Sequence, residues 1–262
     1  MLKHHEDSIQ NLVKYYSGNP DILAIILAGS VAKGLERPDS DIDAEIVVSD
    51  AYYDRLCKEN SLAETIDGYC TYNGGYFDIN YFTKDFLRAS ALRASEPSRN
   101  RFIKARCLFS RDTEVEELIP KIGVFQESEK PDKLFSFYCA LWINYTFFWQ
   151  VSKANPYLRV RAAADMTLFG YRLLLQENEV LFPGHKPLMM TVAALQNKPD
   201  NILAKNDRLC KELSDEAADD FVNSILNFIR YQPPKDFNKI LTRYTDDFET
   251  WWYKERYNVA EW

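Results

Sequence analysis

Cysteine, histidine and long apolar runs are scarce in this chain of 262 residues. Its five cysteines are scattered without a CxxC pair, and there are only three histidines. This excludes a zinc ribbon or a disulfide framework and is typical of reduced thiols. No apolar run approaches the roughly 20 residues of a membrane span, and residues 1–7 lack the apolar segment of a signal peptide. We therefore expect a cytoplasmic protein without a membrane partner.

Basic residues are also fewer than acidic ones. The chain has 32 Lys and Arg against 39 Asp and Glu, a net charge of −7. Residues 1–125 contain 20 acidic and 15 basic side chains, and residues 126–262 contain 19 and 17. Neither half is suited to an extended nucleic-acid backbone. The balance favours a small substrate, and a cationic one fits it well.

The first half of the chain alternates short apolar runs with amphipathic segments. The dipeptide Gly74-Gly75 after Asn73 is a strong hairpin signal between two such runs. Pattern and turn residues predict strands over 21–28, 42–48, 64–72, 76–82 and 105–109. We expect a small mixed-sheet domain over residues 1–125.

The pattern of apolar residues changes after a polar segment that contains Pro131. Beyond it, apolar residues recur at steps of three and four over 134–149, 157–177 and 215–230. No strand pattern follows residue 125. The sequence therefore predicts an α+β protein, with an all-α helical bundle over residues 126–262.

The chemistry is concentrated in one motif. Gly29-Ser30 follows an apolar run, and ten residues later Asp41 and Asp43 stand two apart at the start of the next run. Alternate residues of a strand face the same side, about 7 Å apart. Neighbouring carboxylates repel each other unless a cation lies between them. A Gly-Ser turn offers backbone N–H groups and a hydroxyl to phosphate oxygens.

A third carboxylate stands in an apolar alternation, at Asp78 between Phe77 and Ile79. Burying a lone carboxylate is costly unless a metal or a donor compensates for it. Three Asp side chains on neighbouring strands are suited to Mg²⁺, which prefers oxygen ligands and retains water for substrate phosphates. The constellation indicates metal-dependent nucleotidyl transfer.

These residues make the chain resemble the nucleotidyltransferase superfamily related to DNA polymerase beta. The match includes Gly29-Ser30, the small residues Ala32 and Gly34, and Ser40 before Asp41-x-Asp43. Within that superfamily the chain looks most like bacterial aminoglycoside and lincosamide nucleotidyltransferases, in which a catalytic domain precedes a helical one. Residues 182–187, Phe-Pro-Gly-His-Lys-Pro, look like a segment of some of these relatives.

The resemblance implies a role for each motif residue. Gly29 and Ser30 would hold the β- and γ-phosphates of ATP or another nucleoside triphosphate, with weaker contacts from Lys33 and Ser40. One or two Mg²⁺ ions would be bound by Asp41, Asp43 and Asp78, and Asp78 would serve as metal ligand, general base or both. Residues 126–262 would bind the acceptor. Several relatives are dimers, so a homodimer fits the resemblance.

Two groups of charged residues lie outside the motif. Glu45 follows Asp43 on the same strand face, and we interpret it as a polar residue near the strand end rather than a support for the site. Residues 84–111 contain eight basic side chains, which could supply triphosphate contacts. For most of them we expect a solvated surface instead.

The acceptor is not fixed by the motif. The leading hypothesis is transfer of AMP from ATP to a hydroxyl of a small molecule, with antibiotic resistance as its setting. The first alternative is an AMPylating enzyme of the antitoxin type, which modifies a protein hydroxyl. The second is a non-catalytic nucleotide-binding relative, against which the three retained Asp residues argue.

Overall fold

A computed structural model describes all 262 residues of the protein. Two compact units divide the chain, Met1–Val124 and Phe125–Trp262. The first unit contains every strand and the second contains only helices and loops. This arrangement confirms the predicted α+β class.

The first unit is built on a five-stranded sheet with the order β3-β4-β2-β1-β5. Three of the four neighbouring pairs are antiparallel, whereas β2 and β4 run parallel. The strands are β1 (Ile22–Leu27), β2 (Ile42–Val48), β3 (Ala63–Ile66), β4 (Phe77–Phe82) and β5 (Arg106–Ser110). The central strand β2 therefore lies between an antiparallel and a parallel partner.

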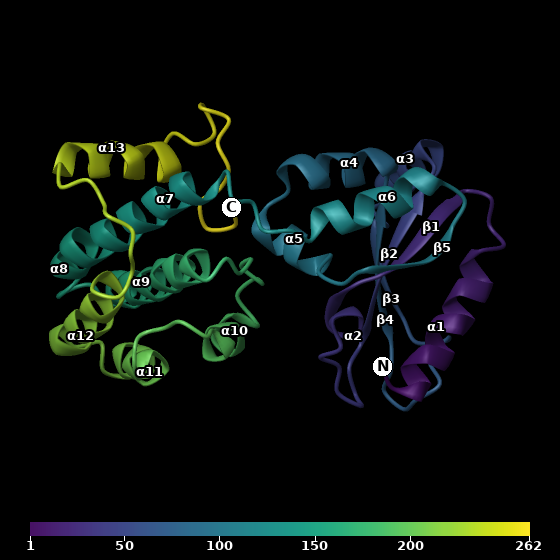
Figure 1. Cartoon of the computed structure of the whole chain (residues 1–262), viewed down its shortest axis with the longest axis horizontal. Helices are drawn as coiled ribbons and strands as arrows, with labels where there is room; N and C mark the ends of the chain where they lie inside the picture. Colours follow the sequence, from purple (N-terminus) through teal and green to yellow (C-terminus); the bar gives the residue numbers. More distant parts are fainter. The chain divides into compact units, whose positions relative to one another are not determined.

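Helices cover both faces of this sheet (Figure 1). Side chains of α1 and α3 share one core cluster with the strands, and side chains of α4 and α6 share the other. Both faces of β2 and β1 are consequently buried. The helices are α1 (Lys3–Tyr16), α2 (Gly29–Lys33), α3 (Asp50–Glu59), α4 (Lys84–Arg93), α5 (Glu96–Arg101) and α6 (Thr113–Ile122).

Capping residues mark where these helices begin. The side chains of Ser49, Thr83 and Asp112 accept hydrogen bonds from backbone N–H groups in the first turns of α3, α4 and α6. Such caps satisfy donors that have no partner within the helix. The chain is thus directed out of each strand and into the following helix at a defined residue.

The second unit is a helical bundle around one apolar core. Helices α7 and α9 are its central pair, and a π-helical turn, η1 (Asn144–Phe148), extends α7. The remaining helices pack around them. The elements are α7 (Lys130–Ile143), α8 (Trp149–Val151), α9 (Pro156–Glu177), α10 (Leu188–Ala194), α11 (Ile202–Glu212), α12 (Asp215–Leu226) and α13 (Phe237–Phe248).

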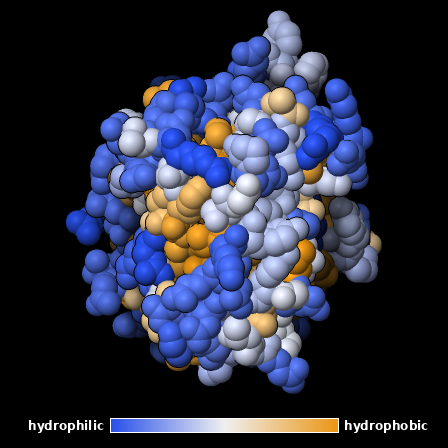
Figure 2. Space-filling model, turned by 90° about the vertical axis from the view of Figure 1, so that its right-hand side faces the viewer, coloured by the Kyte–Doolittle hydropathy of each residue, from blue (hydrophilic) through white to orange (hydrophobic).

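No helix is both long and apolar enough to cross a lipid bilayer. Figure 2 shows a largely hydrophilic face on which apolar side chains gather in a compact patch rather than in a continuous band.

Candidate active site

The parallel pairing of β2 and β4 brings two of the motif carboxylates together. Asp43 lies directly opposite Asp78 in the register of these strands. Asp41 precedes Asp43 by two residues and therefore belongs to the same face. Ile42 and Ala44, the two neighbours of Asp43 in the chain, are buried in the core on the other face. The structure thus places all three predicted carboxylates on one side of the sheet.

The electrostatics of Asp43 show how close these charges are. Burial raises the pKa of Asp43 above its ordinary value, and the charges of Asp41 and Asp78 raise it further. Arg101 and Lys33 act in the opposite direction. An anionic cluster of this kind is stabilised by a cation. Its oxygen donors match the preference of a hard divalent ion such as Mg²⁺.

The three carboxylates share one side of the sheet but do not converge as a closed ligand set. No group of three or more His, Cys, Asp or Glu side chains is positioned to hold a metal ion. The hydroxyl of Tyr76 donates to Asp41 Oδ2 at 3.3 Å, and Thr65 Oγ1 donates to Asp78 Oδ1 at 3.0 Å. Sequence reasoning missed these two supporting residues, because the register of β3 was needed to place Thr65 beside Asp78.

Gly29 forms the floor beneath Asp43. Its φ is +65°, and a Cβ atom built there would lie 1.7 Å from Asp43 Oδ2. The N–H of Ala28 donates to the carbonyl of Asp43 at 3.0 Å. Only glycine fits this conformation and this close approach. The predicted Gly29-Ser30 turn therefore lies against the carboxylate cluster.

Ser40 and Lys33 both have protein partners. Ser40 Oγ accepts from the N–H of Arg37 at 2.9 Å, and the hydroxyl of Tyr72 donates to its carbonyl at 2.6 Å. Ser40 thereby fixes the turn before Asp41. Lys33 Nζ donates to Asn100 Oδ1 at 2.6 Å. Burial lowers the pKa of Lys33, whereas the charge of Asp43 raises it.

Glu45 is not the strand-end residue that the sequence suggested. It is fully buried in the middle of β2, and its two carboxylate oxygens have no hydrogen-bond partner. A charge interaction remains, because Arg101 Nη1 lies 3.3 Å from Oε1. Burial raises the pKa of Glu45 to about 7, and Arg101 opposes this shift. The first interpretation failed because helices cover both faces of β2.

The basic segment divides into structural residues and one residue directed at the site. Lys84 and Arg88 form ion pairs with acidic residues of α4 and of the start of α6. Arg99 and Arg111 donate to backbone carbonyls. Arg101, in contrast, acts on the site, because its charge lowers the pKa of Asp43. Its distance from the motif along the chain hid this role.

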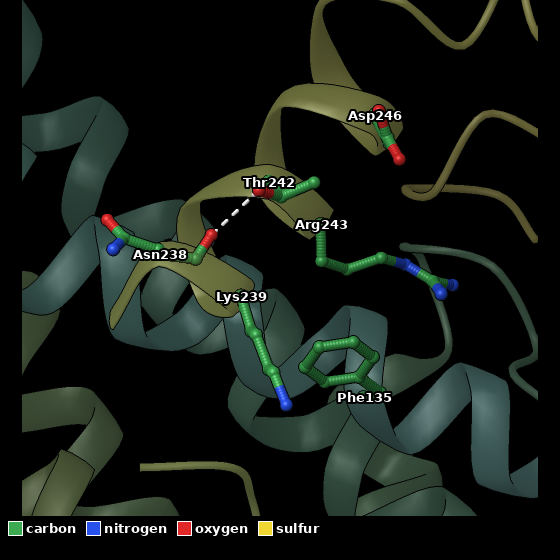
Figure 3. A pocket seen from close by; sticks show the side chains of 6 residues that line it. All are labelled: Phe135, Asn238, Lys239, Thr242, Arg243 and Asp246. Atoms are coloured by element: carbon green, nitrogen blue, oxygen red, sulfur yellow. Dashed lines mark hydrogen bonds between the residues drawn. The ribbon is translucent and has the colours of Figure 1, made fainter. Parts of the chain in front are cut away.

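The second unit contains a shallow pocket of about 400 Å³ between α7 and α13 (Figure 3). Arg243 lines it, but its guanidinium is bound to Asp132 and Asp247. Asp246 is paired with Lys254 at 2.5 Å. The charged groups of this pocket are therefore engaged within the protein, apart from Lys239, whose side chain extends beside Phe135.

The three carboxylates thus lie on a mixed sheet, beside the Gly29-Ser30 turn. Residues 10–114 match the family model described as "Polymerase beta, Nucleotidyltransferase". This match covers most of the first unit, which is therefore similar to nucleotidyltransferase domains of the superfamily related to polymerase beta. Domains of this kind generally use a nucleoside triphosphate and a divalent metal ion.

A solved structure with some likeness to the chain is a nucleotidyltransferase-like protein from Exiguobacterium sibiricum 255-15. The two are 11% identical, and the match covers 96% of this chain and 79% of that chain with a TM-score of 0.44. No curated protein matches the chain.

Proposed function

We propose that the protein transfers a nucleoside monophosphate to a hydroxyl of a small molecule and releases pyrophosphate. ATP is the first candidate donor, and Mg²⁺ is the first candidate ion. The observation that carries the proposal is the register of Asp43 with Asp78, next to Gly29 and Asp41. Carboxylates placed together in this way serve metal-assisted phosphoryl chemistry.

The reaction forms one bond and breaks another. The acceptor oxygen bonds to the α-phosphorus, and the bond from that phosphorus to the bridging oxygen of pyrophosphate breaks. Asp41 and Asp43, with Asp78, would hold the divalent ion. When bound, such an ion stabilises negative charge on the phosphate oxygens. Asp78, which accepts a hydrogen bond from Thr65, takes up the proton of the acceptor hydroxyl.

Gly29, Ser30 and Lys33 are the proposed phosphate contacts, with Ser40 supporting the loop that carries Asp41. We add Arg101 to this group. The buried carboxylate of Glu45 holds its guanidinium on the face that carries Asp43. A guanidinium is well suited to phosphate oxygens. Glu45 is accordingly a positioning residue in this proposal.

The acceptor is proposed to be an aminoglycoside or lincosamide antibiotic, recognised by the helical domain of residues 126–262. The net charge of −7 supports a cationic small molecule over a nucleic acid. The setting would then be antibiotic resistance in a bacterial cytoplasm. A homodimer remains part of the proposal.

Pyrophosphate release tests the proposal. Purified protein is incubated with Mg²⁺, each of the four nucleoside triphosphates and a panel of antibiotics. We expect release that depends on one triphosphate and one acceptor class. Asp43→Asn should reduce the rate at least about 100-fold, more than the loss typical of a residue that only supports a metal ligand. Asp39→Asn is the matched control, because Asp39 is exposed and pairs with Arg37.

Three outcomes separate the candidate functions. Release with no small acceptor, accompanied by AMP on a co-purified protein in mass spectrometry, would favour the AMPylating enzyme. Triphosphate binding without any transfer would favour a non-catalytic relative. Absence of both binding and release would refute nucleotidyl transfer.

A further inference from the structure

A second pocket of about 450 Å³ opens in the first unit, between α1, α3 and the strands β3 and β4. Its volume is within the range of small-molecule sites. Five of the residues that line it are tyrosines, and its single charged residue is Glu64. The tyrosines are Tyr15, Tyr16, Tyr52, Tyr69 and Tyr81.

The pocket is separate from the carboxylate cluster. Tyr81 and Asp78 are three residues apart on β4, so their side chains leave opposite faces of the sheet. Glu64 pairs with Ile79, which is buried in the same core as Tyr81. A ligand in this pocket therefore does not touch the proposed metal ligands.

Glu64 is an exposed residue of the pocket lining, and two phenols hold its carboxylate in place. Its Oε1 accepts a hydrogen bond from the hydroxyl of Tyr16 at 2.8 Å and another from the hydroxyl of Tyr81. Burial raises the pKa of both phenols, so both hydroxyls keep their protons and act as donors. No Lys, Arg or His lines the pocket, and Glu64 has no ion-pair partner.

The aromatic walls attract positive charge as well. The guanidinium of Arg55, which does not line the pocket, lies 4.4 Å from the centroid of the Tyr52 ring. The rings of Tyr15 and Tyr69 stand 4.6 Å apart on another part of the lining. Tyrosine faces bind cations through their quadrupole, most strongly when the cation is desolvated. A site made of aromatic rings around a carboxylate is suited to an organic ammonium group.

We propose that this pocket binds a small organic cation with an alkylated ammonium group. The charge pairs with Glu64, and the alkyl groups contact the tyrosine rings. Tyr16 and Tyr81 hold the carboxylate in place, while Asn19, Asn60 and Ser61, which also line the pocket, offer hydrogen bonds to the rest of the ligand. This site goes beyond nucleotidyl transfer and does not depend on it.

The proposal is tested by measuring the binding of tetramethylammonium to the full chain with ligand-observed NMR. The comparison is tert-butanol, a neutral molecule of similar size whose three methyl groups can make the same apolar contacts. We expect the ammonium to bind at least about ten-fold more tightly, from the charge and cation–π contributions. Glu64→Gln should remove most of that difference. Glu59→Gln is the matched control, since Glu59 is an exposed residue of α3 outside the pocket.

Two further variants keep the result interpretable. Tyr52→Leu removes one aromatic wall and leaves Glu64 intact, so it should weaken ammonium binding even if Glu64→Gln fails to fold. Arg55→Gln removes the protein's own guanidinium beside Tyr52, so the ammonium should bind as tightly as to the wild type or more tightly. Equal affinity for the two probes, or unchanged binding in both Glu64→Gln and Tyr52→Leu, would overturn the proposal.

Discussion

Gly29 is the residue at which backbone conformation and site chemistry meet. Gly29→Ala would combine a positive φ with a Cβ atom 1.7 Å from Asp43 Oδ2. We expect a loss of about 2 kcal/mol in the free energy of unfolding, together with loss of pyrophosphate release. Gly34→Ala is the control, because Gly34 has φ +73° but no atom within 4 Å of its Cβ position. That variant should lose stability only and keep its activity.

The cluster around Asp43 opposes folding when no cation is bound. Burial and the like charges of Asp41 and Asp78 both disfavour the ionised form of Asp43. Asp43→Asn should therefore raise the thermal midpoint of the metal-free protein while abolishing transfer. Mg²⁺ should raise the midpoint of the wild type and leave that of the variant nearly unchanged. A decrease of stability in the metal-free variant would contradict this account.

Arg101 allows the phosphate role to be separated from a structural one. Arg101→Ala should weaken ATP binding by about ten-fold or more, because charge-assisted hydrogen bonds to phosphate are lost. AMP binding should weaken far less, because AMP lacks the β- and γ-phosphates. Arg88→Ala is the matched control, since Arg88 has a similarly exposed side chain and also pairs with a glutamate. Equal losses for ATP and AMP would assign Arg101 to the fold alone.

At the scale of elements, α13 is fixed to α7 through a buried polar contact. Arg243 bonds to Asp247 at 2.8 Å, to Asp132 at 2.5 Å and to the hydroxyl of Ser136. Arg243→Ala would leave Asp247 buried with fewer partners, and we expect a loss of about 3 kcal/mol. Arg208→Ala breaks only an exposed pair on α11 and should cost about 0.5 kcal/mol or less. Urea unfolding of both variants measures the difference.

Much of the first unit was predictable because its signals are local. The strand over 42–48 was predicted from apolar patterning, and the start of α4 is a local feature as well, because Thr83 caps it. The short helix α5 was missed, because six residues with Pro97 near the start give no helical period. Since α5 carries Arg101, the partner of Glu45 was missed with it. The three Asp were recognisable from spacing, whereas Thr65 and Tyr76 required the sheet register.

In the second unit, periodicity predicted the long helices but not their ends. The segment 134–149 was expected as one helix, whereas the structure has α7 followed by a π-helical turn. The aromatic residues of this segment are compatible with an α-helical and with a π-helical repeat. The sequence pattern therefore does not reveal where the π-helical turn, which holds one extra residue, occurs. Helices α10, α11 and α13 were not predicted. Helix α10 has only seven residues, and α11 and α13 mix apolar with polar residues; their packing against α7, α9 and α12 determines them.

At the scale of the whole molecule, every proposed nucleotide contact from Gly29 to Arg101 belongs to the first unit. That unit has its own cores on both faces of the sheet. We therefore expect residues 1–124 to fold alone and to bind ATP with Mg²⁺, but to lack transfer to the acceptor. Circular dichroism and calorimetric titration of this fragment check the expectation. A folded fragment without ATP affinity would place essential contacts in residues 125–262.

The parallel pairing of β2 with β4 also has a consequence for the order of folding. The pairs β1–β2 and β3–β4 join strands that are consecutive in the chain, whereas β2–β4 needs the intervening residues 49–76 to close a longer loop. Closing such loops is slow relative to local pairing. Asp43 and Asp78 meet only in that step. A nascent or partly folded chain therefore lacks the paired carboxylates, and metal affinity should develop only after this long-range pairing has formed, later than the local pairs β1–β2 and β3–β4.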